Sequence, residues 1–313
     1  MSCELIAECC QNHNGSREIL KRMIHASAEA GATYAKIQAL RSNELTFRER
    51  FEEGQVLADG TTKVIKRPFQ AEQDRLKNLD LNDDDESWFV EECKRAGVKS
   101  MITAFTRLST QRLVAAGFDA VKIASYDCRS TSLLKEVAVS FKTVVVSTGA
   151  SFDNEIIDAA KLFDKNHVSF LHCVTIYPTP LDQLHMNRMG WLRQFSTKVG
   201  FSDHTTPATT NLKASMLAIA LDADIVERHF TVLEPHETRD GPVSINPNQL
   251  RELCDFAKLP SESRIEKLSA DWPEWKIGLG EKTRDLSATE LLNRDYYSGR
   301  VASWHDGKQI SNQ

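Results

Sequence analysis

Short apolar segments rich in β-branched residues alternate with amphipathic segments along most of the chain. An apolar run of about four to eight residues predicts a buried strand, whereas apolar positions spaced about three or four residues apart predict a helix. The strands that we expect from this pattern cover residues 4–9, 33–38, 98–103, 120–125, 143–147, 167–172, 197–202 and 224–229.

Helical patterns fill most of the gaps between these strands, and several of them carry end signals. Residues 16–30 begin with Ser16 at a capping position and stop at Gly31. Glycine also follows the helical patterns of residues 84–96 and 109–116, and a glycine just after the last periodic residue is a common helix terminus. Further amphipathic helices are expected at residues 131–140, 153–163 and 207–221.

The regular alternation of strands and helices predicts the fold class. Consecutive strands joined by helices pair in parallel through right-handed crossovers, and eight such repeats can close into an α/β barrel of the (β/α)8 or TIM type. The alternative is an open doubly wound sheet, but no G-x-G-x-x-G motif follows the first strand. We therefore expect a catalytic barrel over residues 1–257 and a C-terminal extension over residues 258–313.

Two segments interrupt the alternation. Residues 41–83 form a long polar excursion after the second strand, and insertions of this kind beside a barrel mouth are usually lids or binding loops. The extension at residues 258–313 follows the last barrel helix and holds three of the five tryptophans. We expect this extension to cover part of the barrel surface or of a dimer surface.

The composition excludes several classes of partner. With 39 Lys and Arg against 44 Asp and Glu, the 313-residue chain carries a net charge of −5, which argues against a nucleic-acid surface. No apolar run approaches the roughly 18 residues of a membrane-spanning helix, so we expect no membrane partner. The seven cysteines have no C-x-x-C spacing and suggest neither a disulfide framework nor a cysteine zinc site. Reduced thiols fit a cytoplasmic protein.

Polar and ionisable side chains stand at nearly every predicted strand end. In a barrel of this kind the site lies at the carboxyl ends of the strands, and several strands contribute to it. A purely structural barrel would place such groups there less consistently. The side chains at these ends include Glu8, Lys36, Gln38, Thr103, Lys122, Ser125, Ser147, His172, Tyr177, Ser202, His204, Glu227 and His229.

His204 and His229 close two adjacent strands, which lie about 4.8 Å apart in a sheet. Two imidazoles at one rim can bind one divalent metal ion and leave positions open for substrate and water. Two neutral imidazoles bring no charge to the metal, so a carboxylate or several waters would complete the site. The alternative is that each residue is a hydrogen-bonded structural histidine.

Lys36 and Lys122 close the second and fourth strands. A lysine inside a barrel mouth is unfavourable without an anion, so the two suggest a substrate with phosphate or carboxylate groups. Two alternatives stay open: a Schiff-base lysine of an aldolase, or a lysine paired with a neighbouring acid. Glu8 ends the first strand inside an apolar run and is either such a lysine partner or a general base.

Several motifs at these strand ends occur together in a fixed order. They are IAECCQNHNG at residues 6–15, GATYAKIQ at 31–38, VKIAS at 121–125, VSTG at 146–149, LHCVTIYPTP at 171–180, VGFSDHT at 199–205 and IVERHFT at 225–231. With these motifs the sequence resembles the sialic acid synthase (N-acetylneuraminate synthase-like) family over about residues 4–257.

The resemblance implies an enzyme that condenses phosphoenolpyruvate with an N-acetylated amino sugar, an aldehyde such as N-acetylmannosamine. The product would be a nonulosonic, sialic-acid-like 2-keto-3-deoxy acid, and inorganic phosphate would leave by C–O cleavage. The resemblance also implies a (β/α)8 barrel, a divalent metal ion (Mn2+ or Mg2+) and a homodimer.

The resemblance can be carried over to single positions of this sequence. The metal ligands would be His204 and His229, and the catalytic carboxylate would be Glu8. The phosphoenolpyruvate contacts would be made by Lys36, Thr103, Lys122, Ser125, Ser147 and Ser202. The sugar contacts would be made by Gln38, Tyr177 and Asp240, with Thr175 as a further substrate-binding residue.

The sequence departs from the family pattern at several of these motifs. Cys10 and Tyr126 stand where the family has glycine, and a larger side chain there narrows the mouth or re-aims a neighbour. Asp127 replaces a common glutamate, and Thr175 replaces an asparagine that many members have. Cys9 and Cys10 point to opposite faces of their strand, and we expect both to fill the core.

A further departure concerns the C-terminus. The family usually ends in an antifreeze-protein-like domain that reaches into the partner subunit and supplies a sugar-binding arginine. The residues from Tyr297 onward resemble only the beginning of that domain. We therefore expect the acceptor contact made across the dimer to be missing or replaced.

Two other functions compete with that of a synthase. A Schiff-base barrel aldolase acting on a related sugar acid would form a covalent intermediate on Lys36 or Lys122. A non-catalytic sugar-binding barrel would keep the fold without the reaction. The presence of Glu8, both lysines and both histidines argues against this last alternative.

Overall fold

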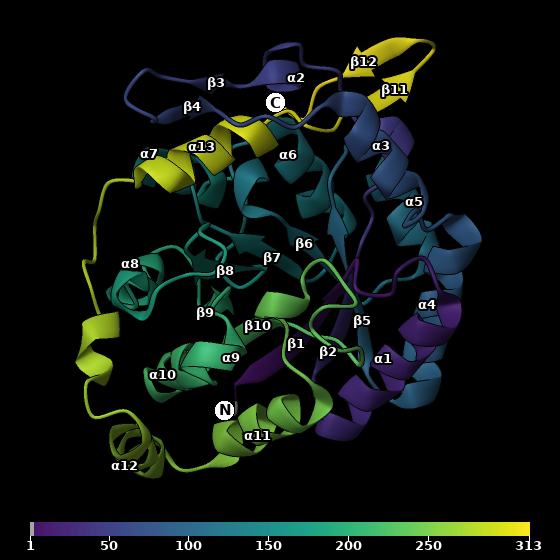
Figure 1. Cartoon of the computed structure of the whole chain (residues 1–313). Helices are drawn as coiled ribbons and strands as arrows, with labels where there is room; N and C mark the ends of the chain where they lie inside the picture. Colours follow the sequence, from purple (N-terminus) through teal and green to yellow (C-terminus); the bar gives the residue numbers. More distant parts are fainter. Residues whose placement is uncertain (1–2) are drawn as a thin grey trace.

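In the computed structural model, which describes residues 3–313, eight parallel strands form one closed barrel (Figure 1). All eight predicted strands are confirmed to within about two residues, and the closed barrel excludes the open doubly wound sheet. Residues 1 and 2 of the predicted barrel segment lie outside the described residues. The barrel strands are β1 (Glu4–Cys10), β2 (Tyr34–Gln38), β5 (Lys99–Ala104), β6 (Ala120–Ile123), β7 (Val144–Ser147), β8 (Val168–Cys173), β9 (Lys198–Asp203) and β10 (Ile225–His229).

Helices surround the barrel and connect its strands (Figure 1). The predicted glycine terminators Gly31, Gly97 and Gly117 all take left-handed backbone angles, with φ of 94°, 78° and 85°. The predicted cap is also present, since the side chain of Ser16 accepts a hydrogen bond from the Ile19 amide. The covering helices are α1 (Arg17–Ala30), α4 (Asp83–Ala96), α5 (Ser109–Ala116), α6 (Thr131–Ser140), α7 (Asp153–Ala160), α8 (Asn187–Leu192), α10 (Lys213–Ala220) and α11 (Pro247–Lys258).

The expected single helix over residues 207–221 is wrong in one respect. The segment forms two helices, α9 (Pro207–Thr210) and α10, because Asn211 between them has a left-handed φ of 54° that a continuous helix excludes. The short helix α8 was not predicted from the sequence at all. Its six residues are too few to give a helical period.

The inward-facing side chains change from apolar to polar along the barrel. Seven buried residues fill the barrel interior on the amino-terminal side of the polar layer: Ile6, Tyr34, Met101, Ala120, Val145, Leu171 and Ile225. Side chains repeat on one face of a strand every two residues, so the next inward layer consists of Glu8, Lys36, Thr103, Lys122, Ser147, Cys173 and Glu227. The polar layer is therefore the floor of the barrel mouth.

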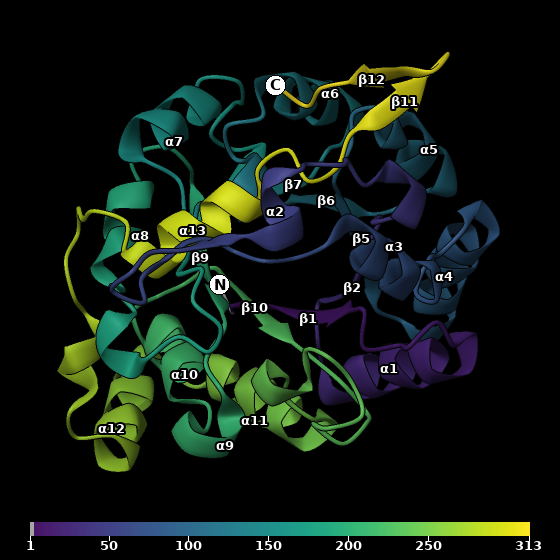
Figure 2. The ribbon, with the colours of Figure 1, turned by 45° about the horizontal axis from the view of Figure 1, so that its top comes forward.

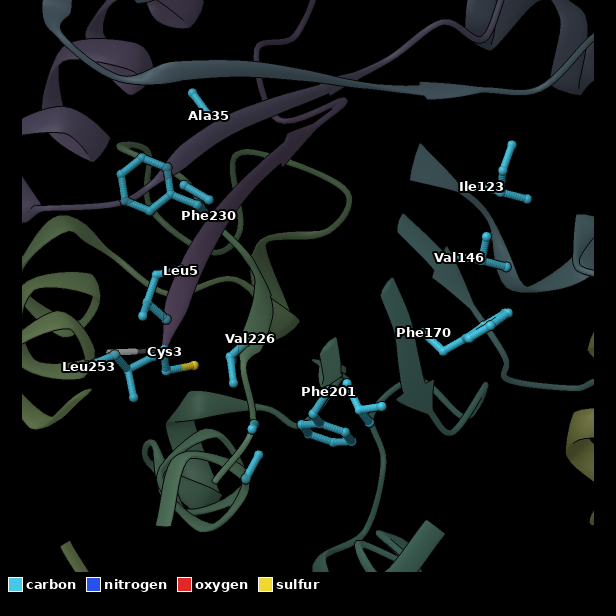
Figure 3. Close-up of a cluster of buried hydrophobic side chains, with 14 of the residues drawn as sticks. Cys3, Leu5, Ala35, Ile123, Val146, Phe170, Phe201, Val226, Phe230 and Leu253 are labelled. Carbon is cyan, nitrogen blue, oxygen red and sulfur yellow. The ribbon is translucent and has the colours of Figure 1, made fainter. Parts of the chain in front are cut away.

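The main hydrophobic core lies between the outer face of the barrel and the helices. Outward-facing side chains such as Leu5, Phe170 and Phe201 pack there, and Leu253 of α11 packs beside Leu5 (Figure 3). These side chains are at most 2% exposed. The core thus holds the strands from outside, and polar groups occupy the inner face only toward the carboxyl ends of the strands.

Two segments far apart in the sequence lie side by side over the barrel mouth (Figure 2). Phe51 and Val64 of the excursion pack against Tyr296 in one buried cluster, and the Leu45 and Val301 backbones form a β-bridge. We call this pair of segments the cover. The excursion contributes η1 (Ser42–Glu44), α2 (Arg50–Glu53), β3 (Gln55–Val56), β4 (Thr62–Val64) and α3 (Phe69–Lys77). The extension contains α12 (Ser261–Asp271), η5 (Trp275–Gly278), α13 (Ala288–Tyr297), β11 (Ser303–His305) and β12 (Lys308–Ile310).

Within residues 3–313, no helix has both the length and the hydrophobicity to cross a membrane.

Gly200 of β9 faces the barrel interior at a position where no larger side chain fits. A Cβ at Gly200 would lie 1.9 Å from the carbonyl oxygen of Ile225 and 2.8 Å from a methyl carbon of Leu171. We expect Gly200→Ala to lower the free energy of unfolding by about 3 kcal/mol or more, measured by thermal or urea denaturation. Gly190→Ala is the matched control, because no atom lies within 4 Å of its added Cβ, and we expect it to leave stability unchanged or slightly raised. Equal effects of the two substitutions would contradict this account of the barrel interior.

Candidate active site

The carboxyl ends of the barrel strands surround a cavity of about 640 Å3. Of the site residues implied by the family resemblance, only Thr175 does not line this cavity: it is fully buried, and its carbonyl oxygen accepts a hydrogen bond from Asn293 Nδ2 at 2.8 Å. His172, expected at a strand end, does not line it either, because its ring is buried and Nε2 is hydrogen-bonded to the Leu184 carbonyl oxygen at 2.7 Å. The predicted residues that line the cavity are Glu8, Lys36, Gln38, Thr103, Lys122, Ser125, Ser147, Tyr177, Ser202, His204, His229 and Asp240. Their roles remain predictions.

On one side of the cavity floor, Lys36 lies between two carboxylates. Its Nζ contacts the carboxylate of Glu8 and lies 3.5 Å from Oε2 of Glu227. Nζ also donates a hydrogen bond to Thr103 Oγ1 at 2.8 Å. Glu8 is therefore a lysine partner in the free protein, one of the two roles expected for it.

Lys122 approaches the same glutamate from another strand. Its Nζ donates to Glu227 Oε1 at 3.3 Å and to Ser147 Oγ at 2.6 Å. Ser202 Oγ donates to the same Glu227 oxygen at 2.7 Å. Glu8, Lys36, Lys122 and Glu227, each at most 5% exposed, thus form one buried network that we call the charge network.

The charge network shifts two pKa values. Burial, with the nearby Lys122 charge, lowers the pKa of Lys36 to about 8, although Glu227 acts in the opposite direction. Burial would raise the pKa of Glu227, but Lys122 and Lys36 outweigh it and hold that pKa well below its usual range. Glu227 is therefore a carboxylate at neutral pH, and Lys36 is a cation that can lose its proton under mildly alkaline conditions.

Glu227 is a cavity residue for which the strand-end pattern alone predicts no role. The signal was present, because Glu227 and His229 are two residues apart in β10 and must face the same side of the strand. Once His229 is placed at the cavity, Glu227 follows one layer below it.

The two predicted histidines lie together at the rim. The ring centroids of His204 and His229 are 5.3 Å apart. Burial, and for His204 the neighbouring His229, lower the pKa of both rings, so both are neutral imidazoles at pH 7. Nδ1 of His204 is buried and has no hydrogen-bond partner among residues 3–313. Neutral, unpartnered imidazole nitrogen is the form that binds metal ions.

Asp240 and Cys10 stand beside His229. One potential ligand atom from each of the three residues lies within 4.8 Å of the others. Cys10 Sγ lies 3.1 Å from Oδ2 of Asp240, so the expectation that Cys10 is core filler is wrong, whereas Cys9 on the opposite face does belong to the main core. The donors present, with the nearby His204, fit a divalent cation.

A buried ion pair fixes the strand ends that carry the histidines. Arg228 Nη1 lies 2.7 Å from Oδ1 of Asp203, and neither side chain is exposed to solvent. Arg228 Nη2 also donates to the Thr205 carbonyl oxygen at 2.9 Å. These residues are direct neighbours of His229 and His204 in the sequence, so the ion pair holds β9 and β10 in a fixed relation at the site.

At the outer part of the cavity, three arginines lie within 4 Å of the carboxylate of Glu72, and a fourth lines the same cavity. Arg75 Nη2 lies 2.9 Å from a Glu72 oxygen, Arg300 contacts the same carboxylate, and Arg239 lies 3.8 Å away. Arg67 lines the same cavity. We call these four the arginine collar. The collar could not be predicted from strand ends, because its members lie on the excursion, a loop and the extension.

The extension contributes one wall of the cavity. Tyr297 at the end of α13 stacks on Tyr126, with ring centroids 4.6 Å apart and an angle of 18° between the planes. Arg294 pairs with Glu155 at 2.5 Å and donates to the Ala150 carbonyl oxygen at 2.6 Å, which ties α13 to the barrel. Part of the extension therefore covers the barrel, as expected.

The chain is a closed (β/α)8 barrel, and lysines, carboxylates and histidines meet at the carboxyl ends of its strands. This arrangement is typical of (β/α)8-barrel enzymes. Residues 23–264 match the family model described as the NeuB family, and the chain belongs to this family. The resemblance inferred from the sequence, and with it the assignment as an enzyme of the sialic acid synthase type, is confirmed.

Curated relatives and solved structures agree with this assignment. The chain is 28% identical to the N,N'-diacetyllegionaminic acid synthase of Campylobacter jejuni over 80% of this chain and 74% of that protein. It is 24% identical to human N-acetylneuraminate-9-phosphate synthase, over 82% of this chain and 70% of that protein. The crystal structure of the N-acetylneuraminic acid (sialic acid) synthetase of Leptospira borgpetersenii superposes with a TM-score of 0.69 at 26% identity, covering 95% of this chain and 91% of that one.

The buried ion pair at the histidine-bearing strand ends can be tested by removing one charge. We expect Asp203→Asn to reduce the free energy of unfolding by about 3–5 kcal/mol, because Arg228 would be left buried without its partner. Asp158→Asn is the control, since the pair of Asp158 with Lys161 is about two-thirds exposed and should contribute at most about 1 kcal/mol. Urea denaturation measures both, and a small effect of Asp203→Asn would show that the pair does not support the rim.

Proposed function

We propose that this enzyme condenses phosphoenolpyruvate with an N-acetylated amino sugar of the N-acetylmannosamine kind. The product is then a sialic-acid-like 2-keto-3-deoxy acid, and inorganic phosphate leaves. The charge network carries this proposal, because two buried lysines on one cavity floor provide a site for a small polyanion next to ligands for a cation. The relatives named as sialic-type acid synthases support the same class of substrate.

The polyanion is best accommodated on the floor of the cavity. Phosphoenolpyruvate carries a carboxylate and a phosphate, and Lys36 and Lys122 are the buried cations that can pair with them. Both lysines are partly neutralised by glutamates, so a bound anion competes with Glu8 and Glu227 for them. The hydroxyls of Thr103, Ser125, Ser147 and Ser202 supply further donors around the same floor.

A divalent cation would be held at the rim by His204 and His229. When bound, it supplies Lewis acidity toward the aldehyde oxygen of the sugar. The methylene carbon of the enolpyruvyl group forms the new carbon–carbon bond, water adds at C2, and the C2–O bond to phosphate breaks. Glu8 would take the proton from that water, a role that becomes available when the anion draws Lys36 away from it.

The outer part of the cavity would bind the acceptor sugar. Gln38, Tyr177 and Asp240 line the cavity together with the arginine collar. We further propose that residues 258–313 serve as part of this acceptor site rather than as a separate functional domain, because α13 and Arg300 line the same cavity. Arg300 then offers, within one chain, a cationic sugar contact. The homodimer is a proposal that rests on the family resemblance, which also implies Mn2+ or Mg2+ as the cation.

A Schiff-base aldolase is the second candidate, favoured by the lowered pKa of Lys36. An amine that is partly neutral near pH 8 can attack a carbonyl carbon. Trapping with borohydride in the presence of a keto-acid substrate separates the two functions. A covalent adduct on Lys36 would favour the aldolase, and its absence favours the condensation.

The proposed reaction is tested by phosphate release from phosphoenolpyruvate in the presence of a divalent cation. We expect release that depends on a 2-acetamido or 2,4-diacetamido aldose and falls by at least about a hundredfold in Lys122→Met, because the phosphoenolpyruvate site loses a cation. His229→Ala should also abolish it. Phosphate release with N-acetylmannosamine is compared with release with its 6-phosphate, in wild type and in Arg300→Met. If the variant loses more activity with the phosphorylated sugar, the sugar 6-phosphate binds at the collar. No release with any acceptor would contradict the proposal.

The pKa of Lys36 predicts a pH dependence. Lys36, faced by Glu8, Glu227, Lys122 and Thr103, carries its positive charge below about pH 8 and loses it above. We expect kcat/KM for phosphoenolpyruvate to fall about tenfold per pH unit above that value, since this parameter reports groups of the free enzyme. The substrate phosphate loses its last proton near pH 6, outside this window. A Lys36→Met variant should have a lower kcat/KM for phosphoenolpyruvate, and its pH profile should lack the bend near pH 8. If the bend persisted in that variant, it would belong to another titrating group.

A further inference from the structure

We propose that Cys10 and Asp240 join His229 and His204 as ligands of the rim cation, and that the Cys10 sulfur turns the preference of this enzyme toward Zn2+ and Co2+. The inference deepens the proposed function, since it concerns the cation which that reaction would use. It goes beyond the two-histidine site inferred from the sequence, and it contradicts the expectation of Mn2+ or Mg2+. Its test needs neither substrate.

The first support is the convergence of ligand atoms from three separate places in the chain. Cys10 ends β1, His229 ends β10, and Asp240 immediately precedes η4 (Gly241–Val243). Their potential ligand atoms lie within 4.8 Å of one another, and Cys10 Sγ is 3.1 Å from Oδ2 of Asp240. Such distances allow all three groups to reach one ion after small side-chain movements.

The second support is the backbone at Cys10. Its φ of 36° lies in the left-handed region, which side chains other than glycine rarely adopt. The pairing of β1 with β2 also shifts register between Glu8 and Cys10. The Cys10 side chain faces Asp240, while Cys9 stays in the outer core. Unfavourable backbone angles of this kind concentrate at functional sites.

The third support is independent of the cysteine. His204 is 5% exposed, and its Nδ1 has no hydrogen-bond partner in the described part of the chain. Its ring lies 5.3 Å from that of His229, between centroids. A buried polar nitrogen without a partner is unfavourable, and a metal ion bound beside His229 would supply the missing interaction.

The donor chemistry indicates the kind of cation. A thiolate and a carboxylate bring two negative charges, which supply the charge that two neutral imidazoles lack. The thiol proton leaves to solvent when the sulfur binds, because the thiolate is the ligand form. Sulfur and imidazole nitrogen suit Zn2+, Co2+ and Fe2+, whereas Mg2+ requires a shell of oxygen ligands. A rim with one carboxylate, two imidazoles and one sulfur therefore disfavours Mg2+.

The competing interpretation is that Cys10 only donates a hydrogen bond to Asp240. Two substitutions separate the alternatives. Cys10→Ser keeps a hydrogen-bond donor without sulfur, and Cys10→Gly removes the side chain while glycine accepts the left-handed φ, so the fold is retained. Cys9→Ala is the matched control, because it removes a buried neighbouring thiol that points into the outer core.

The experiment is a titration of the metal-free full chain with Co2+ alone, followed by competition between Zn2+ and Mn2+. We expect a near-ultraviolet sulfur-to-cobalt charge-transfer band in wild type and Cys9→Ala, and no such band in Cys10→Ser or Cys10→Gly. Zn2+ affinity should fall by about 10–100-fold or more in both Cys10 variants, with a smaller change for Mn2+. Circular dichroism and the melting temperature of the metal-free variants verify the fold.

Three outcomes would overturn the inference: no Co2+ binding by wild type, Co2+ binding without the sulfur band, or a band that persists in Cys10→Gly. Each is distinguishable from failure of the proposed function. An inactive protein that shows the Cys10-dependent band would retain this site and lose the proposed reaction. An active enzyme without the band would retain the reaction and lose this site.

Discussion

The site depends on the mutual neutralisation of two lysines and two glutamates inside the barrel. Removing such charges from water costs several kcal/mol for each ion unless partners are close. Glu8, Lys36, Lys122 and Glu227 come from four different strands, so they meet only when the barrel closes in this register. A shift of one residue in any of these strands would turn its charge into the hydrophobic layer outside. The same charges that prepare the site therefore help to specify the alignment of the fold.

The rim and the floor of the cavity use different means of positioning. On the floor, side chains are placed by strand alternation alone, with apolar residues one layer below them. At the rim, the buried pair of Arg228 and Asp203 holds the ends of β10 and β9, and the loop before η4 brings in Asp240. Strand alternation thus positions the floor, while an ion pair and a loop position the rim.

The barrel and the floor could be predicted from the sequence because both follow from period-two alternation, which is a local property. Alternation was enough to predict the strands and, at their ends, Lys36, Lys122 and His229. The arginine collar and the wall formed by Tyr297 could not be predicted, because they depend on long-range contacts, across 228 positions from Arg300 to Glu72 and 171 positions from Tyr297 to Tyr126. Cys10 was misassigned for a third reason. Alternation places Cys10 on the same face as Glu8, but a cysteine is commonly apolar filler, and the sequence does not show that Asp240 approaches it from 230 positions away.

The cover over the cavity joins residues near the start of the chain to residues near its described end, through contacts such as that of Phe51 with Tyr296. During synthesis, all eight barrel strands leave the ribosome before α13 does. A nascent chain can therefore close its barrel, with the charge network formed, while the mouth still lacks one wall. The finished cavity can then form only after α13 has been made, and the order of translation separates formation of the scaffold from formation of the acceptor pocket.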